Sequence, residues 1–129
     1  MSELGNWRRY LSEWGCGAVL THEDQTLAAI RALRNAMSRV CHMNFEPLGN
    51  IDLSKDVLVD VVVGVPKPKE VHVNELIKEI PLNCTKRVKV VNGGLEAEGA
   101  YNEGLGRNVK VVIAVAYITI YVRTSCGDV

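Results

Sequence analysis

The sequence predicts an α+β fold, a two-layer sandwich in which helices cover one face of a mixed sheet. Three stretches carry this prediction. Residues 25–40 have the apolar spacing of an amphipathic helix, whereas residues 57–65 and 109–122 are runs of mostly apolar, β-branched residues typical of buried strands. A length of 129 residues corresponds to a single domain, 1–129, with a tail expected to fray from about residue 123.

The first strand is expected over residues 7–14, where polar and apolar residues alternate, and it should stop at Gly15 and Gly17. A polar turn follows, in which Thr21 and Asp24 are both suitable N-caps for the next helix. Free N–H groups and a partial positive charge collect at the start of a helix. This strand-to-helix junction is therefore the first place to look for chemistry.

The helix expected over residues 25–40 is the most clearly marked element. Its larger apolar residues recur at three- and four-residue spacing, which predicts one buried face. Its alanines raise helix propensity and permit close packing. The residues predicted to form the buried face are Leu27, Ile30, Leu33, Met37 and Val40.

The middle of the chain should contain a loop over residues 44–56 and then a strand over residues 57–65. That strand is apolar on both faces except at Asp60, which is typical of a central strand covered on both sides. A short helix is expected over residues 71–80 and a third strand over residues 87–91.

Residues 92–108 hold several glycines among acidic residues and are expected to form a long loop, either functional or mobile. The last strand, residues 109–122, is apolar except at Lys110 and Thr119. The predicted order is therefore β-α-β-α-β-β, and the strands linked by helices are expected to run parallel.

The apolar strands also predict self-association. A two-layer sandwich leaves one sheet face without helices, and the strands at 57–65 and 109–122 are apolar on both faces. We therefore expect the bare face to meet another copy of the chain in a homo-oligomer, as a dimer, a trimer or a higher assembly.

The balance of charge restricts the partners. Fifteen basic and fifteen acidic side chains give no net charge, which argues against a generic binder of nucleic acid or of anionic membranes. Residues 1–15 lack the apolar segment of a secretion signal, and the most apolar run, residues 111–118, is far shorter than the ~20 residues that span a bilayer as a helix. We expect a cytoplasmic protein whose cysteines stay reduced. The four cysteines are Cys16, Cys41, Cys84 and Cys126.

No cofactor or metal is expected. Gly15 and Gly17 invite comparison with a dinucleotide fingerprint, but Leu20 stands where the third glycine would be and no acidic residue follows at the required place. A tight turn in which glycine permits unusual backbone angles is the better interpretation. The histidines and cysteines also lack the spacing of zinc ligands.

A ligand site is nevertheless predicted at the strand-to-helix junction. Arg31 and Arg34 lie three residues apart on the helix and could clamp a carboxylate or a phosphate, or could equally be solvated or paired with acidic neighbours. The predicted ligand-binding residues are Gly15, Gly17, Thr21, His22, Arg31, Arg34, Gly93 and Gly94.

Catalytic candidates are Cys16, whose place near a helix start could lower its pKa, and His22. Glu96, Glu98 and Glu103 could also supply a general acid or base. The ordinary alternatives are a small buried residue at position 16 and solvated side chains at the others.

Four motifs occur in the chain in this order: Trp14-Gly15-Cys16-Gly17, Asp24-x-Thr26-x-Ala28-Ala29-x-Arg31-Ala32-x-Arg34-x-Ala36, Gly64-Val65-Pro66 and Val91-x-Gly93-Gly94. Together they resemble a small family of conserved hypothetical proteins, first defined on a Listeria protein and found in bacteria and plants. That family has an N-terminal Gly-x-Gly-x-Asp-x-His-Gly signature followed by an Asp-x-Thr-x-Ala-Ala-x-Arg-Ala helix. The signature is degenerate here, because Val19, Thr21 and His22 stand where the family has Asp, His and Gly. The resemblance extends over residues 9–122 and implies the fold, without an assigned activity.

The function expected from these observations is binding of a small anionic ligand at a cleft between subunits of a homo-oligomer. The alternatives are a small-molecule hydrolase of the cyclic-amide type, or a non-catalytic scaffold that has lost an ancestral site. The hydrolase alternative draws on a looser similarity to single units of trimeric or threefold-repeated hydrolases that act on cyclic amides. In it Cys16, His22 or a loop glutamate would be the chemical group.

Overall fold

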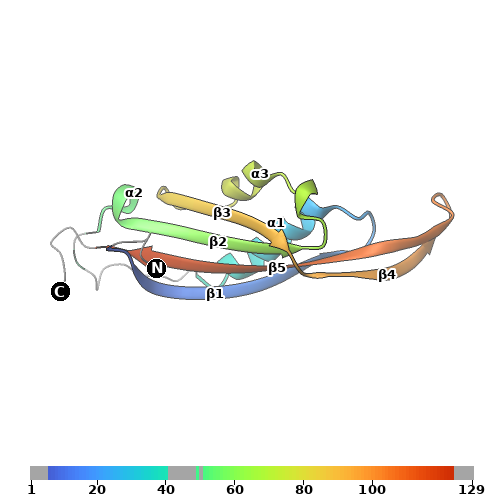
Figure 1. Ribbon diagram of the computed structural model, residues 1–129, viewed down its shortest axis with the longest axis horizontal. Coiled ribbons are helices and arrows are strands. Elements are labelled where there is room, and N and C mark those ends of the chain that lie inside the picture. The colour runs from blue at the N-terminus through green and yellow to red at the C-terminus, as the bar shows by residue number, and fades with distance from the viewer. Residues whose placement is uncertain (1–5, 41–48, 50, 124–129) are drawn as a thin grey trace.

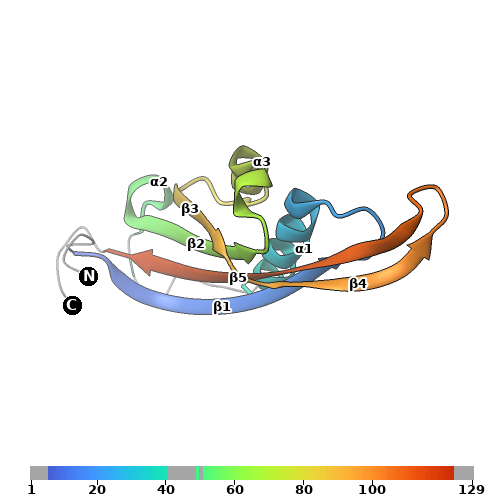
Figure 2. The same ribbon diagram turned by 45° about the vertical axis from the view of Figure 1, so that its right-hand side comes forward.

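The computed structural model shows one five-stranded sheet with its helices on one side, and it describes residues 6–40, 49 and 51–123 (Figures 1 and 2). The predicted α+β sandwich with a mixed sheet is confirmed. No helix in these residues is long and apolar enough to cross a membrane. The elements are β1 (Arg8–Val19), α1 (Gln25–Met37), α2 (Leu53–Asp56), β2 (Val57–Val65), the 3-10 helix η3 (Pro68–Glu70), α3 (Val73–Lys78), β3 (Thr85–Asn92), β4 (Leu95–Asn102) and β5 (Arg107–Val122).

Strand β5 pairs with three of the other four strands. The strand order is β1-β5-β2-β3, and β4 pairs with β5 outside this order. One edge of β5 pairs antiparallel with β1, and the other edge pairs antiparallel with β2 and, nearer its start, with β4. Strands β2 and β3, which α3 connects, are parallel as expected. Strands β1 and β2 also run in the same direction, but β5 lies between them.

Strand β1 does not stop at its glycines, and the prediction that it would was wrong. It continues to Val19, with Gly15 opposite Ala116 and Gly17 opposite Ala114. Neither glycine has a positive φ, so unusual backbone angles are not the reason for glycine here. Both lie under α1, and a Cβ on either one would overlap the helix backbone. The glycines let α1 approach β1 closely.

The alanines of α1 make the contact with the sheet, which corrects the predicted buried face. Of the five residues predicted to be buried, Leu33 is fully buried and Val40, just beyond the helix, is also buried, whereas Leu27, Ile30 and Met37 only flank the core. The helix ends at Met37 rather than Val40, and Asp24 caps its start by accepting the Leu27 N–H at 3.0 Å. The buried residues of α1 are Gln25, Ala28, Ala29, Ala32, Leu33 and Ala36.

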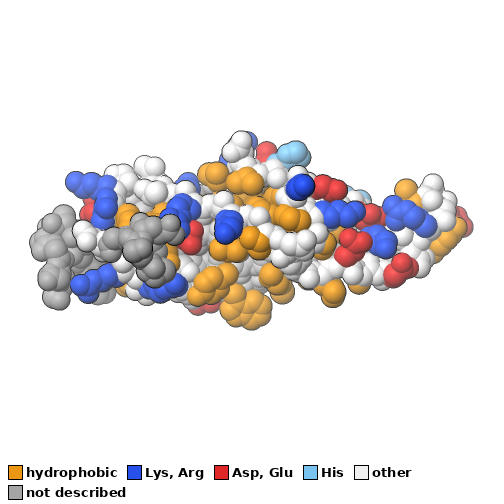
Figure 3. Space-filling view, viewed as in Figure 1, with side chains coloured by type: hydrophobic (Ala, Val, Ile, Leu, Met, Phe, Trp, Pro, Cys, Tyr) orange, Lys and Arg blue, Asp and Glu red, His pale blue; other side chains and the backbone are white. Residues whose placement is uncertain are grey.

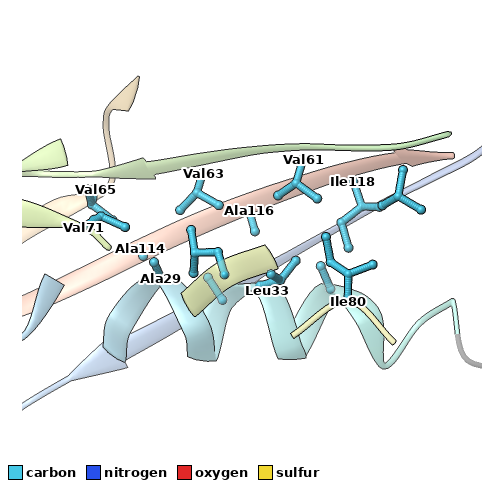
Figure 4. Close-up of a cluster of buried hydrophobic side chains, with 14 of the residues drawn as sticks. Ala29, Leu33, Val61, Val63, Val65, Val71, Ile80, Ala114, Ala116 and Ile118 are labelled. Carbon is cyan, nitrogen blue, oxygen red and sulfur yellow. The ribbon is translucent and has the colours of Figure 1, made fainter. Parts of the chain in front are cut away.

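The core lies between α1, α3 and one face of the sheet (Figure 4). Side chains of β2 and β5 that alternate along each strand point to this layer. Figure 4 shows Leu33 and Ala29 of α1 facing these strands, with Ile80 and Val71 closing the side near α3. The core residues of the two strands include Val59, Val61, Val63, Val65, Ala114, Ala116, Ile118 and Ile120.

Residues 92–108 are not a long loop. They contain β4, which turns at residues 103–106 and pairs with the start of β5. Gly94 has a φ of +68°, which favours glycine, and a Cβ there would overlap the carbonyl oxygen of Ile113. We call β4 together with residues 107–113 of β5 the β-arm; it pairs with β1 only at residues 112 and 113, and its far end extends beyond the rest of the sheet (Figures 1 and 2).

Several predicted boundaries also change. The expected loop at 44–56 contains α2 where the structure describes it, and the helix expected at 71–80 is divided into η3 and the shorter α3. Strand β2 has the predicted bounds. The tail expected to fray lies outside the described residues from residue 124 onward.

We predict that Gly15→Ala destabilises the fold by about 1–3 kcal/mol, because the added methyl group must push α1 away from β1. Urea unfolding would measure the change. Gly104→Ala is the matched control, since a Cβ there would meet only the Asn102 side chain at 3.2 Å. Equal unfolding midpoints for Gly15→Ala and the unmodified chain would contradict the close-packing role.

Candidate functional site

The predicted junction site is divided among several places in the structure. Gly15 and Gly17 lie beneath α1, whereas Gly93 and Gly94 connect β3 to β4, with the Gly93 N–H donating to Val65 at 2.9 Å. The nearest neighbours of these four glycines are backbone and side-chain atoms of the fold itself, so close packing explains them.

The turn before α1 is bonded within the chain. The Thr21 hydroxyl and His22 Nδ1 lie 2.9 Å apart. Glu23, which has a φ of 54°, accepts from Arg107 at 2.9 Å and from the Lys110 N–H at 3.3 Å, so the turn is fixed to the β-arm. The hydrogen bond from Arg107 is the main reason that the pKa of Glu23 lies below its usual value.

The two predicted clamp arginines are both engaged. Arg34 donates to the carboxylate of Glu79 through two nitrogens, at 2.6 and 3.1 Å, and this hydrogen bonding raises the pKa of Arg34. Arg31 donates to the carbonyl oxygen of Ala18 at 2.8 Å. The sequence left open whether these arginines bind a ligand, are solvated or pair with acidic neighbours. Arg34 pairs with an acidic neighbour, Glu79.

Arg31 belongs to a ladder of side chains that covers the free edge of β1. Arg31 and Asn35 of α1 and Arg39, two residues after its end, follow at intervals of four residues, and all three bond to backbone groups of β1. Asn35 Oδ1 accepts the Cys16 N–H at 3.1 Å, and Arg39 donates to the carbonyl oxygen of Trp14. An uncovered edge strand is a template for pairing with another chain. The ladder closes this edge against strand addition.

The catalytic candidates do not form a pair. Cys16 is exposed on the sheet, and His22 bonds to Thr21 in the turn beyond the end of β1. No hydrogen bond joins them within the described residues. Glu96 and Glu98 lie 3.8 and 3.9 Å from the ammonium group of Lys110, and over the same residues no three His, Cys, Asp or Glu side chains are placed to hold a metal.

The sheet face away from α1 and α3, which we call the open face, forms rows of side chains that cross the strands. Residues opposite each other in a register point to the same side, so the pairings define the rows. In the order β1, β5, β2, β3 the rows are Arg9–Tyr121–Leu58–Thr85, Ser12–Thr119–Asp60–Arg87, Trp14–Tyr117–Val62–Lys89 and Cys16–Val115–Gly64–Val91.

The open face carries large apolar side chains in contact with solvent. Trp14 is 59% exposed, Tyr117 46% and Val115 44%, and Leu95 continues the apolar surface onto the β-arm with 56% exposed. Figure 3 shows hydrophobic side chains gathered over the middle of the sheet and charged side chains over the β-arm. The face without helices therefore presents several large apolar side chains to solvent.

One row of the open face is polar throughout. Ser12, Thr119, Asp60 and Arg87 cross all four strands, and Asp60 Oδ1 lies 3.3 Å from Arg87 Nε. The pKa of Tyr117, in the adjacent row, lies below its usual value, chiefly because of side-chain hydrogen bonding from Ser12 and Thr119, with a smaller contribution from Arg9.

The polar row is the part of the site that sequence reasoning missed. In the sequence, Asp60 and Thr119 stand out only as polar residues in two apolar strands, and nothing indicates that they face each other. The signal was nevertheless present, since a polar residue inside a buried strand needs a partner. Only the register of β2 with β5 brings the two exceptions together.

Comparisons with known proteins agree with the fold. The model of a family described as "Conserved hypothetical protein (Lin0512_fam)" matches residues 9–120. The chain is also similar to the crystal structure of an FtsZ-like protein of unknown function from Nostoc punctiforme, with 27% identity and a TM-score of 0.76. That match covers 92% of this chain and 98% of the other. No curated protein matches the sequence.

We predict that Asn35→Ala opens the edge of β1. The Cys16 N–H would lose its acceptor, so its hydrogen exchange should become faster, and the chain should aggregate more readily. Amide exchange followed by NMR would measure the first effect and light scattering the second.

Arg34→Ala is the matched control, because it removes the ion pair with Glu79 and leaves the ladder intact. Unchanged exchange at Cys16 in Asn35→Ala would show that the ladder does not protect the edge.

Proposed function

The chain belongs to the family of conserved hypothetical proteins Lin0512_fam, and from its geometry we propose that it is the subunit of a homo-oligomer whose copies meet through the open face. A small anionic ligand is bound between the paired faces. The observation that carries the proposal is the set of exposed apolar rows on the one sheet face that has no helix layer.

The exposed apolar residues support a protein partner. Trp14, Tyr117 and Val115 are neighbours in two adjacent rows, so their exposed area is continuous rather than scattered. Soluble monomers rarely expose large contiguous apolar patches, and aromatic residues are enriched in interfaces. Covering these side chains with the same surface of a second copy removes both patches from water.

The β-arm extends the same surface. Leu95, Ala97, Val111 and Ile113 occupy its open-face positions, in continuation of Val115 on β5. A ribbon of only two strands is marginally stable in water without further packing. Contact with a second copy supplies that packing. Because side chains cover the edge of β1, the open face is the surface that remains for association.

Charge supports an anion between the copies. Within the rows of the open face there are three cations, Arg9, Arg87 and Lys89, and one carboxylate, Asp60. Bringing two such faces together concentrates positive charge where water is reduced, which is unfavourable unless an anion neutralises it. The anion site is thus proposed on the strands of the open face rather than at Arg31 and Arg34, which bond to the Ala18 carbonyl oxygen and to Glu79.

We predict that Val115→Asp reduces the mass of the protein in solution to that of a monomer. The new carboxylate would have to be buried without a partner in the paired faces. Light scattering over a range of concentrations would measure the mass, and circular dichroism would verify the fold. Leu95→Asp tests the β-arm in the same way.

Val73→Asp is the control, because Val73 is an exposed valine on α3, away from the open face. A protein that is monomeric at all concentrations would contradict the proposal. So would an oligomer that keeps its mass in both Val115→Asp and Leu95→Asp.

A further inference from the structure

Two cations of the open face, Arg87 and Lys89, lie together on β3 and have donors that no group of the described residues uses. Arg87 contacts Asp60 only through Nε, at 3.3 Å, which leaves its two terminal amino groups without a bond. Lys89 makes no hydrogen bond or ion pair in the described residues. Arg31 and Arg39, by contrast, are held by the edge of β1.

Arg87 and Lys89 are neighbours on one face of β3. They are two residues apart on a strand, so their Cα atoms are separated by roughly 6.6 Å. Asp60 holds the Nε of Arg87, so the remaining N–H groups are available for a second carboxylate. A guanidinium can bind a carboxylate with two parallel hydrogen bonds, and an ammonium group beside it adds charge.

An apolar strip lies beside these cations. In the row of Lys89, Val62 of β2 comes next and Tyr117 of β5 follows, and the adjacent row has Gly64 beside Val62. The strip is therefore lined by small residues on β2 between longer side chains on β3 and β5. The Tyr117 side chain shares the row of Val62 and Lys89 and is 46% exposed, so its ring is accessible beside the strip.

We propose that this part of the open face binds an aromatic carboxylate. Its carboxylate contacts Arg87 and Lys89, and its ring lies on Val62 against the ring of Tyr117. Strands are spaced about 4.8 Å apart, so a single ring next to its carboxylate spans the distance from β3 across β2. Aromatic pairs and bidentate carboxylate contacts supply the recognition. This inference rests on the proposed function, since it names the anion that the paired faces hold.

The test is a calorimetric titration of the full chain with benzoate. We expect binding that weakens by about tenfold or more in Arg87→Gln and in Lys89→Gln, because each variant removes a charged donor. Arg87→Lys keeps the charge without the fork of donors and should weaken binding less than Arg87→Gln. The control is Lys69→Gln, which removes an exposed lysine of η3 and should leave the affinity unchanged.

Three further probes separate the parts of the ligand. Acetate lacks the ring, benzyl alcohol lacks the charge, and inorganic phosphate has charge without an apolar body. All three should bind more weakly than benzoate. Phosphate that binds as tightly as benzoate would overturn the aromatic part of the inference. Benzoate binding of equal strength in Arg87→Gln, Lys89→Gln and the unmodified chain would overturn the site itself.

The mass of each sample, measured by light scattering, distinguishes this inference from the proposed function. An oligomer that does not bind benzoate overturns the ligand inference and leaves self-association standing. A monomer that binds benzoate through Arg87 and Lys89 supports the site and overturns the proposed oligomer.

Discussion

The close approach of α1 to β1 determines most of what the molecule presents to its surroundings. Gly15 and Gly17 have no side chains under the helix, and Ala32 and Ala36 meet them with small ones. This contact involves backbone atoms on both sides, so larger residues could not be accommodated without moving the helix. It also places α1 near the outer strand of the sheet, within reach of its free edge.

Two properties of the surface follow from that placement. Arg31, Asn35 and Arg39 reach the outward backbone groups of β1 and close an edge that would otherwise pair with other chains. The helices also lie on one side only, which leaves the opposite face with exposed Trp14 and Tyr117. The fold thus covers one edge of the sheet and leaves exposed the face through which we propose that copies associate.

The sequence was sufficient for elements whose pattern is local. Strand β2 begins and ends as predicted, because a run of valines between a polar segment and Pro66 leaves little choice. The start of α1 was also predictable from Asp24. The glycines of β1 were misinterpreted because a glycine required for close packing looks the same in sequence as a glycine required for a turn.

The candidate site was less accessible, because it depends on register. Asp60 and Thr119 are 59 positions apart in the chain and become neighbours only when β2 pairs with β5. Arg31 and Arg34 seemed free for a ligand because their acceptors, the Ala18 carbonyl and Glu79, are supplied by tertiary packing. Strand β4 was missed because its glycines and charges resemble a loop, and pairing with β5 overrides that local preference.

Labelling of Cys16 tests the central claim, that copies of the chain associate through the open face, most directly. Its thiol is exposed in the row of Val115, whereas Cys84 is half-buried beside the helix layer and serves as an internal reference. The rate of alkylation at each cysteine can be followed by peptide mass spectrometry over a range of protein concentrations. Labelling of Cys16 that slows with rising concentration, while that of Cys84 does not, is the predicted result. A Cys16 rate independent of concentration would contradict association through this face.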